Sequence, residues 1–69
     1  MMLRVEPDGA EWRVVRLGIG GEEARFDKRG DAVDWACRVA TRRAPATVDV
    51  IDAAGQINAR YSFDAARAA

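Results

Sequence analysis

The sequence predicts an α+β fold, with an antiparallel sheet of four or five strands and one helix packed on one face. Several short segments alternate apolar and polar residues with a period of two, which is typical of half-buried strands. Residues 32–44 instead repeat their apolar side chains with the period of a helix. Turn-forming residues separate the segments, among them Pro7-Asp8-Gly9 and residues 53–55. We therefore expect a single domain over residues 1–69, with an ordered core at 2–63 and a C-terminal tail at 64–69.

The N-terminal half contains two strand segments and a candidate third. Leu3 and Val5 alternate with charged residues, and the run at 12–17 is rich in β-forming residues. The period of two divides this second run between two faces, with Trp12 and Val14 on one, and Arg13, Val15 and Leu17 on the other. The glycines within 18–21 lack the spacing of a phosphate-binding loop, so they predict a flexible hairpin connection. The pattern leaves open whether residues 22–26 form a third strand.

Residues 32–44 are predicted to form the helix. At about 100° per residue, one stripe carries small apolar side chains, namely Ala32, Val33, Ala36, Val39 and Ala40. Asp27 or Asp31 can cap the start, and Pro45 ends the helix because the residue before a proline is disfavoured in the helical conformation. Since small side chains permit a close approach, we expect this helix to lie flat on the sheet.

The C-terminal part is predicted to be a hairpin. Residues 47–52 and 56–63 are its strands, and residues 53–55 form a tight turn between them. The alternation directs one set of apolar side chains toward the helix, namely Val48, Val50, Ile57, Ala59, Tyr61 and Phe63. The same alternation turns Ile51 away from the helix.

The composition argues against catalysis and against a metal site. The chain has no histidine, which is the usual general base and the commonest metal ligand, and only one cysteine, Cys37. Cys37 lies beside the apolar stripe of the helix and is interpreted as a small hydrophobic residue. Glu22 and Glu23 have no activating neighbour and are interpreted as solvated. We expect no enzyme activity, no metal and no cofactor.

Charge and hydropathy limit the kinds of partner. Lys and Arg number 11, and Asp and Glu also number 11, so the formal net charge is +0. Nucleic-acid binders usually carry a basic excess, so a nucleic-acid partner is disfavoured. No run of about 18 apolar residues is present, and we expect no membrane partner. The N-terminus has no apolar signal core and the one cysteine is free, which favours the cytoplasm.

The face of the sheet away from the helix is the first candidate partner surface. One helix covers only one face of a sheet, so Val15, Leu17 and Ile51 would point from the other. Three arginines, Arg4, Arg13 and Arg60, flank them. Exposed apolar patches often mark partner surfaces. The alternative interpretation is that these are scattered apolar residues of the kind found on most protein surfaces.

Two partners fit this surface, a second copy of the chain or a host protein. A domain of 69 residues without a disulfide is only thinly stable, and association is one way to add stability. In a two-fold homodimer, Arg13 and Arg60 would meet acidic residues such as Asp49 across the interface.

The exposed side of the helix is the second candidate surface. It carries Arg38, Arg42 and Arg43, with Trp35 at the edge of the apolar stripe. Such a group of arginines can contact the phosphates of a nucleic acid. The alternative is a solvated helix face with interspersed acidic residues, on which Trp35 packs at the edge of the core.

The spacing of these segments resembles a family of small bacterial domains of unknown function, DUF2188. The resemblance spans residues 3–63 and depends on core and turn positions, namely Trp12-x-Val14, Phe26-Asp27-Lys28, Asp31-Ala32-Val33, Ala36, Ala40, Val50-x-Asp52, Gly55-x-Ile57 and Tyr61. The chain departs from the family by lacking a histidine in its first strand and by the glycine-rich stretch at 18–21. Because the family has no established activity, the resemblance implies a fold and no site.

From these observations we expect a non-catalytic protein-binding module that acts by occupying a surface. By analogy of size and composition, it is a candidate for a phage-encoded inhibitor of a host system, such as an anti-CRISPR protein. The alternative is a nucleic-acid-binding domain that uses the arginine-rich helix face.

Overall fold

The computed structural model describes residues 1–18 and 20–64. The elements of this described part are five strands and one helix, in the order β1 (Met2–Asp8), β2 (Glu11–Arg16), β3 (Glu22–Phe26), α1 (Arg29–Arg42), β4 (Ala46–Ile51) and β5 (Ile57–Phe63). The predicted α+β class is confirmed, and residues 22–26 form a strand. Residue 19 of the predicted glycine-rich connection and residues 65–69 of the predicted tail lie outside the described residues.

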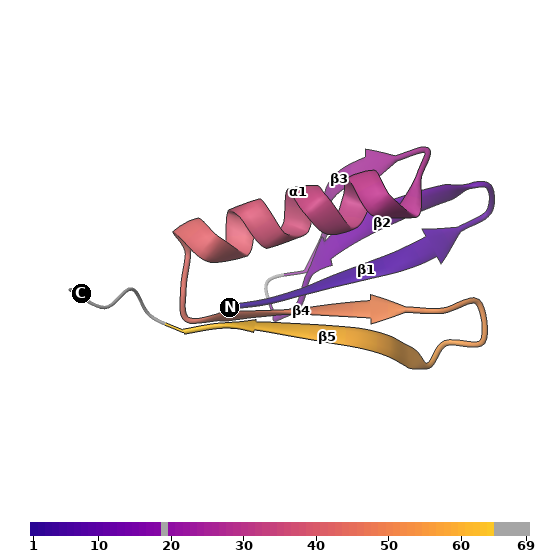
Figure 1. The fold of residues 1–69 in the computed structure, drawn as a ribbon. Coiled ribbons are helices and arrows are strands. Elements are labelled where there is room, and N and C mark those ends of the chain that lie inside the picture. The colour runs from indigo at the N-terminus through magenta and orange to yellow at the C-terminus, as the bar shows by residue number, and fades with distance from the viewer. Residues whose placement is uncertain (19, 65–69) are drawn as a thin grey trace.

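The strands form one mixed sheet in the order β3-β2-β1-β4-β5. Three neighbouring pairs are antiparallel, as predicted, but β1 and β4 are parallel. The difference follows from the path of the chain. After β3, α1 runs back across the sheet, so β4 begins at the same end of the sheet as β1 (Figure 1).

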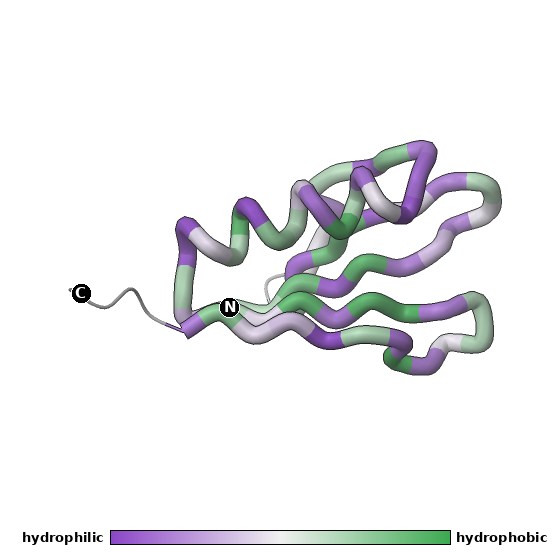
Figure 2. Tube along the Cα trace, viewed as in Figure 1, coloured by the Kyte–Doolittle hydropathy of each residue, from purple (hydrophilic) through white to green (hydrophobic). Residues whose placement is uncertain are grey.

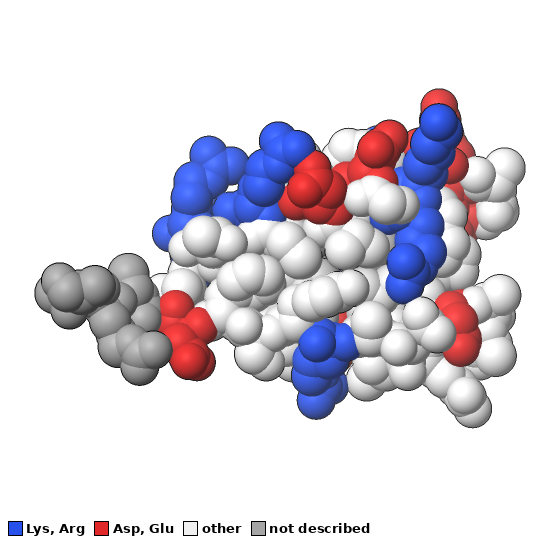
Figure 3. Space-filling model, viewed as in Figure 1, with Lys and Arg blue, Asp and Glu red and all other residues white. Residues whose placement is uncertain are grey.

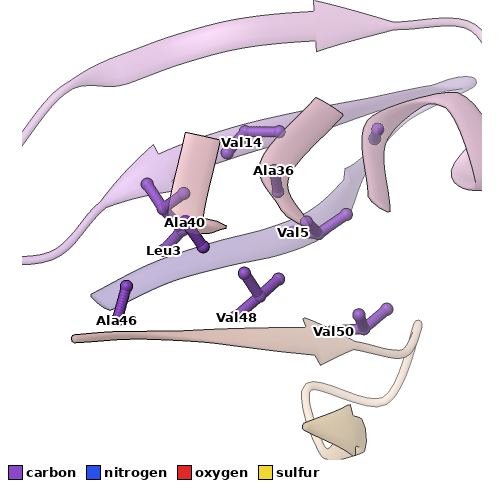
Figure 4. Packing of buried hydrophobic residues seen from close by; sticks show 9 residues of the cluster. Leu3, Val5, Val14, Ala36, Ala40, Ala46, Val48 and Val50 are labelled. Carbon is purple, nitrogen blue, oxygen red and sulfur yellow. The ribbon is translucent and has the colours of Figure 1, made fainter. Parts of the chain in front are cut away.

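The core lies between α1 and one face of the sheet. It consists of small and branched apolar side chains, namely Leu3, Val5, Val14, Ala32, Ala36, Ala40, Ala46, Val48 and Val50. The alternation of hydrophobic and hydrophilic residues along the strands is visible in Figure 2. Figure 4 shows Ala36 and Ala40 directed from α1 toward the valines and the leucine of the sheet. The predicted alanine-rich stripe therefore makes the helix–sheet contact.

The helix begins and ends earlier than the predicted range of 32–44. Its first three residues, Arg29, Gly30 and Asp31, carry no apolar side chain, so the apolar period could not reveal the start of the helix. Lys28 is the N-cap residue and makes no capping hydrogen bond with its side chain, so the predicted cap by Asp27 or Asp31 is wrong. Asp31 instead lies in the first turn, where its charge interacts favourably with the helix dipole. At the other end, the amide of Arg43 donates to two carbonyls of the last turn at 3.0 and 3.2 Å.

The last strand, β5, lies at the edge of the sheet, and its side chains are covered less than predicted. Ala59, Tyr61 and Phe63 pair with the inward-facing residues of β4, which confirms the predicted face. Tyr61 is nevertheless 41% exposed, because α1 packs mainly against β4, β1 and β2 and least against β5. Ile57 is 53% exposed, so its predicted place among the inward residues is wrong.

A register shift between Val50 and Ile51 explains the two failures of the alternation. Beyond the shift, Ile51 pairs with Ile57 and the period of two no longer holds. Ile51, which was expected to be exposed, is only 8% exposed. Ile57, which was expected to be covered, is instead one of the most exposed large apolar residues among those described.

Candidate functional site

Ion pairs between strands occupy the face of the sheet away from α1. The Nε of Arg13 on β2 donates to Oε2 of Glu6 on β1 at 2.6 Å, and these two residues are direct neighbours in the register. Arg25 on β3 forms hydrogen bonds with three acidic residues, Asp8, Glu11 and Glu22, at 2.6 to 3.0 Å. The hydrogen bonds from Arg25 lower the pKa of Glu22 below its ordinary value of 4.5.

A buried aspartate lies near the centre of this face. Asp49 on β4 is only 3% exposed, and the guanidinium of Arg60 on β5 donates to both of its oxygens, at 2.7 and 3.1 Å. These hydrogen bonds raise the pKa of Arg60. Arg4 on β1 is the register neighbour of Asp49, and its buried Nε has no hydrogen-bond partner among the described residues. Arg60 thus compensates the buried charge of Asp49, and Arg4 stays beside the pair.

The predicted apolar partner surface is corrected by these contacts. Val15 and Leu17 are half-buried, and Ile51 is buried, so the three do not form an exposed apolar patch. Arg13 and Arg60, which were expected to reach acidic residues of a partner, are paired with Glu6 and Asp49 of the same chain. Charged side chains dominate this face because the alternation that buries Leu3 and Val5 turns Arg4 and Glu6 to the other side.

The outer edge of β5 presents main-chain groups and apolar side chains together. The amide of Thr47 on β4 donates to the carbonyl of Met1 at 2.9 Å, so the polar main-chain groups of Thr47 face β1. Since these groups alternate along a strand, those of Val48 face β5 and meet Tyr61. The main-chain groups of Arg60 and Ser62 therefore face outward. No strand of the described residues pairs with this edge.

An apolar shelf borders the same edge on the helix side of the sheet. It consists of Ala59, Tyr61 and Phe63, which pair with core positions of β4. Ala59 and Phe63 pack partly against the core, whereas Tyr61 extends into solvent. Figure 3 shows a mostly uncharged band of surface between α1 and the β5 side of the molecule. The alternation predicted that these side chains face the helix and so did not predict an exposed shelf, although β5 carries a single charged residue in seven.

The opposite edge of the sheet has a different character. β3 is five residues long and carries Glu22, Glu23 and Arg25, all of them exposed. Its pairing with β2 is interrupted by a register shift between Val14 and Val15. Short length, charge and irregular pairing are the features that protect an edge strand from association. By length and charge β3 is better protected than β5, whereas a register shift interrupts the pairing of both edge strands.

The predicted arginine face of the helix is exposed, and part of it is neutralised. Arg38 forms an ion pair with Asp34, one turn earlier on α1. Arg42 and Arg43 are exposed and line an open hollow of about 250 Å³ together with Val39. Figure 3 shows positive charge gathered over the C-terminal end of α1.

Trp35 and Cys37 both belong to the packing around the core. The ring of Trp35 lies 6.0 Å from that of Phe26, centroid to centroid, and is half-buried at the edge of the core, as the packing interpretation expected. Trp12 is also half-buried against the core. Burial raises the pKa of the Cys37 thiol, and Asp34 adds to the effect.

Residues 1–18 and 20–64 contain neither a metal-binding cluster nor a membrane-spanning helix. No group of three or more His, Cys, Asp or Glu side chains is arranged to hold a metal ion there. No helix of this part is long and apolar enough to cross a membrane.

Comparison of the chain with protein-family models, curated proteins and solved structures finds no match to any of them. The resemblance to DUF2188 domains therefore stays a prediction, and a proposal about function depends on the site itself.

Proposed function

We propose that this protein is a non-catalytic protein-binding module that accepts an extended segment of its partner along the outer edge of β5. One observation carries the proposal. The exposed large apolar residues of the described chain, Ile57 and Tyr61, both lie on β5, which is an edge strand.

Strand addition uses two features that β5 combines. The outward main-chain groups of Arg60 and Ser62 provide hydrogen bonds that are independent of the partner's sequence. The apolar shelf of Ala59, Tyr61 and Phe63 then selects side chains at alternate positions of the incoming strand. The ion pair with Asp49 holds Arg60 on the opposite face of the sheet, away from the shelf.

The ionisable groups support a binding role rather than a catalytic one. The raised pKa of Cys37 reduces the fraction of thiolate, the reactive form of cysteine. The lowered pKa of Glu22 is opposite to the shift that a general acid needs at neutral pH. An inhibitor of a host system, such as an anti-CRISPR protein, would need only surface occupation, and the β5 edge provides a means for it.

The proposal is tested by blocking the edge without changing the shelf. Ser62→Pro removes an outward amide, and proline is tolerated where the amide of an edge strand faces solvent. Ser62→Ala is the matched control, because it keeps the amide. From nuclease-treated host lysate, we expect Ser62→Ala to retain a protein partner that Ser62→Pro loses, with both variants folded by circular dichroism. Equal capture by the two variants would contradict strand addition.

A second candidate function, nucleic-acid binding, is favoured by the exposed Arg42 and Arg43 at the end of α1. It predicts that nuclease treatment removes the captured material and that Ser62→Pro has no effect. The balanced charge of the chain and the pairing of Arg38 with Asp34 place it second.

A further inference from the structure

We propose that the segment accepted by β5 is β5 of a second copy of this chain, paired antiparallel about a two-fold axis with Tyr61 opposite Tyr61 of the second copy. The inference rests on the proposed function, because it names the partner of the same strand edge. It would join two five-stranded sheets into one continuous sheet.

The direction of the main-chain groups and the charge of Arg60 favour this register over one centred on Arg60. The groups of Arg60 and Ser62 face outward, so a partner strand must place outward-facing residues opposite them. If the axis passed through Arg60, two arginines would lie directly opposite each other, which is unfavourable. With the axis at Tyr61, Arg60 lies opposite Ser62 of the second copy, and about four main-chain hydrogen bonds form around the axis.

The same register joins the two apolar shelves. Tyr61 and Tyr61 of the second copy form a non-hydrogen-bonded pair of the antiparallel ladder. In such pairs the two side chains approach more closely than in hydrogen-bonded pairs. Ala59 lies opposite Phe63 of the second copy, so a small side chain meets a large one on each side of the axis. The pairing also uses only residues 59–63 of β5, which lie beyond the register shift near Ile57.

Charge explains why a second copy is a suitable occupant. The formal net charge of +0 means that two copies do not repel each other at long range. The other edge of the sheet carries Glu22 and Glu23, which disfavours pairing of β5 with β3 and growth of an open chain of copies. Because the two copies use the same β5 edge for their contact, no further copy can add at that edge, and the assembly stops at a dimer.

The contact is small, so we expect a weak dimer. Interfaces below about 1,200 Å² are typical of transient association. Pairing a few residues of one strand falls in this class, and dimers should appear at concentrations on the order of 100 µM.

Sedimentation velocity provides the first test. Between about 10 µM and 1 mM, the mass of the wild-type chain should rise from 7.5 kDa toward twice that value. Ser62→Ala should behave in the same way, whereas Ser62→Pro should stay monomeric. A wild-type chain that is monomeric at the highest concentration would overturn the dimer. The broader proposal would survive that result if Ser62→Pro still lost a lysate partner that Ser62→Ala kept, so the two failures are distinguishable.

Disulfide cross-linking tests the register. In a Cys37→Ala background, Tyr61→Cys places two thiols opposite each other across the axis, within the range that a disulfide requires. Ala59→Cys in the same background is the matched control, because its two thiols lie four residues apart along the strands, about 14 Å. Under mild oxidation we expect Tyr61→Cys to cross-link at least tenfold faster. Equal rates, or faster cross-linking of Ala59→Cys, would exclude this register.

Discussion

Asp49 is the buried charged residue of the described chain, and its environment shows how the open face of the sheet is stabilised. An isolated buried carboxylate is strongly unfavourable unless hydrogen bonds compensate it. The two hydrogen bonds from Arg60 provide that compensation within one chain. The guanidinium of Arg60 is therefore occupied by Asp49. A partner that binds β5 contacts the main-chain groups of Arg60 rather than its charge.

Glu22 leads to a prediction about pH. Its pKa is lowered in the folded state by the hydrogen bonds from Arg25, so the contribution of Glu22 to stability is present above its ordinary pKa of 4.5. The contribution is lost as the pH falls through the lower pKa of the folded state. We expect Glu22→Gln to lower the melting temperature at pH 7, and the difference from wild type to shrink below about pH 4.5.

Glu23→Gln is the control for this experiment. Glu23 is the neighbour of Glu22 and forms no ion pair with the described residues, so its replacement should leave the pH profile of the melting temperature unchanged. A difference between wild type and Glu22→Gln that stays constant down to pH 3 would contradict the role of the Arg25 hydrogen bonds.

At the scale of elements, the contact between α1 and the sheet depends on alanine. Ala36 has no exposed surface and lies at the centre of the stripe (Figure 4). Ala36→Leu should overpack this contact and destabilise the fold by about 1–3 kcal/mol. Thr41→Leu, on the exposed side of the same helix, should change stability by less than about 0.5 kcal/mol. Urea denaturation of both variants measures the two values, and equal values would contradict the helix orientation.

For individual strands and the helix, the sequence pattern predicts most of the buried residues correctly and fails at two positions. The alternation in β2 predicted that Trp12 and Val14 share one face, and both pack in or against the core, because the alternation depends only on local geometry. The helix stripe was predicted for the same reason. The alternation failed at Ile51 and Ile57, since the register shift beside Val50 leaves no trace in the pattern of apolar residues.

At the scale of the whole molecule, the order of the strands could not be predicted from local patterns. The apolar period assigns faces to a strand, but it does not say which strands are neighbours. Only the parallel pairing of β1 with β4 makes β5 an edge, and that pairing joins segments separated by β2, β3 and α1. The sequence therefore directed attention to the open face, where Val15 and Leu17 prove half-buried, and not to the edge at Tyr61.

The net charge of the whole molecule predicts weak binding to nucleic acid. Affinity for DNA or RNA depends mainly on neutralising phosphates, and this chain has a formal net charge of +0. Arg42 and Arg43 alone can contact few phosphates. We expect binding to duplex DNA or RNA weaker than about 10 µM in 150 mM salt, measured by fluorescence anisotropy. The opposite outcome would be a sub-micromolar affinity that is lost in the double variant Arg42→Glu with Arg43→Glu. If the double variant Lys28→Glu with Arg29→Glu, at the other end of α1, keeps that affinity, the helix face is a nucleic-acid site. The equal charge change in the two pairs makes them comparable, since any nonspecific electrostatic effect would weaken both alike.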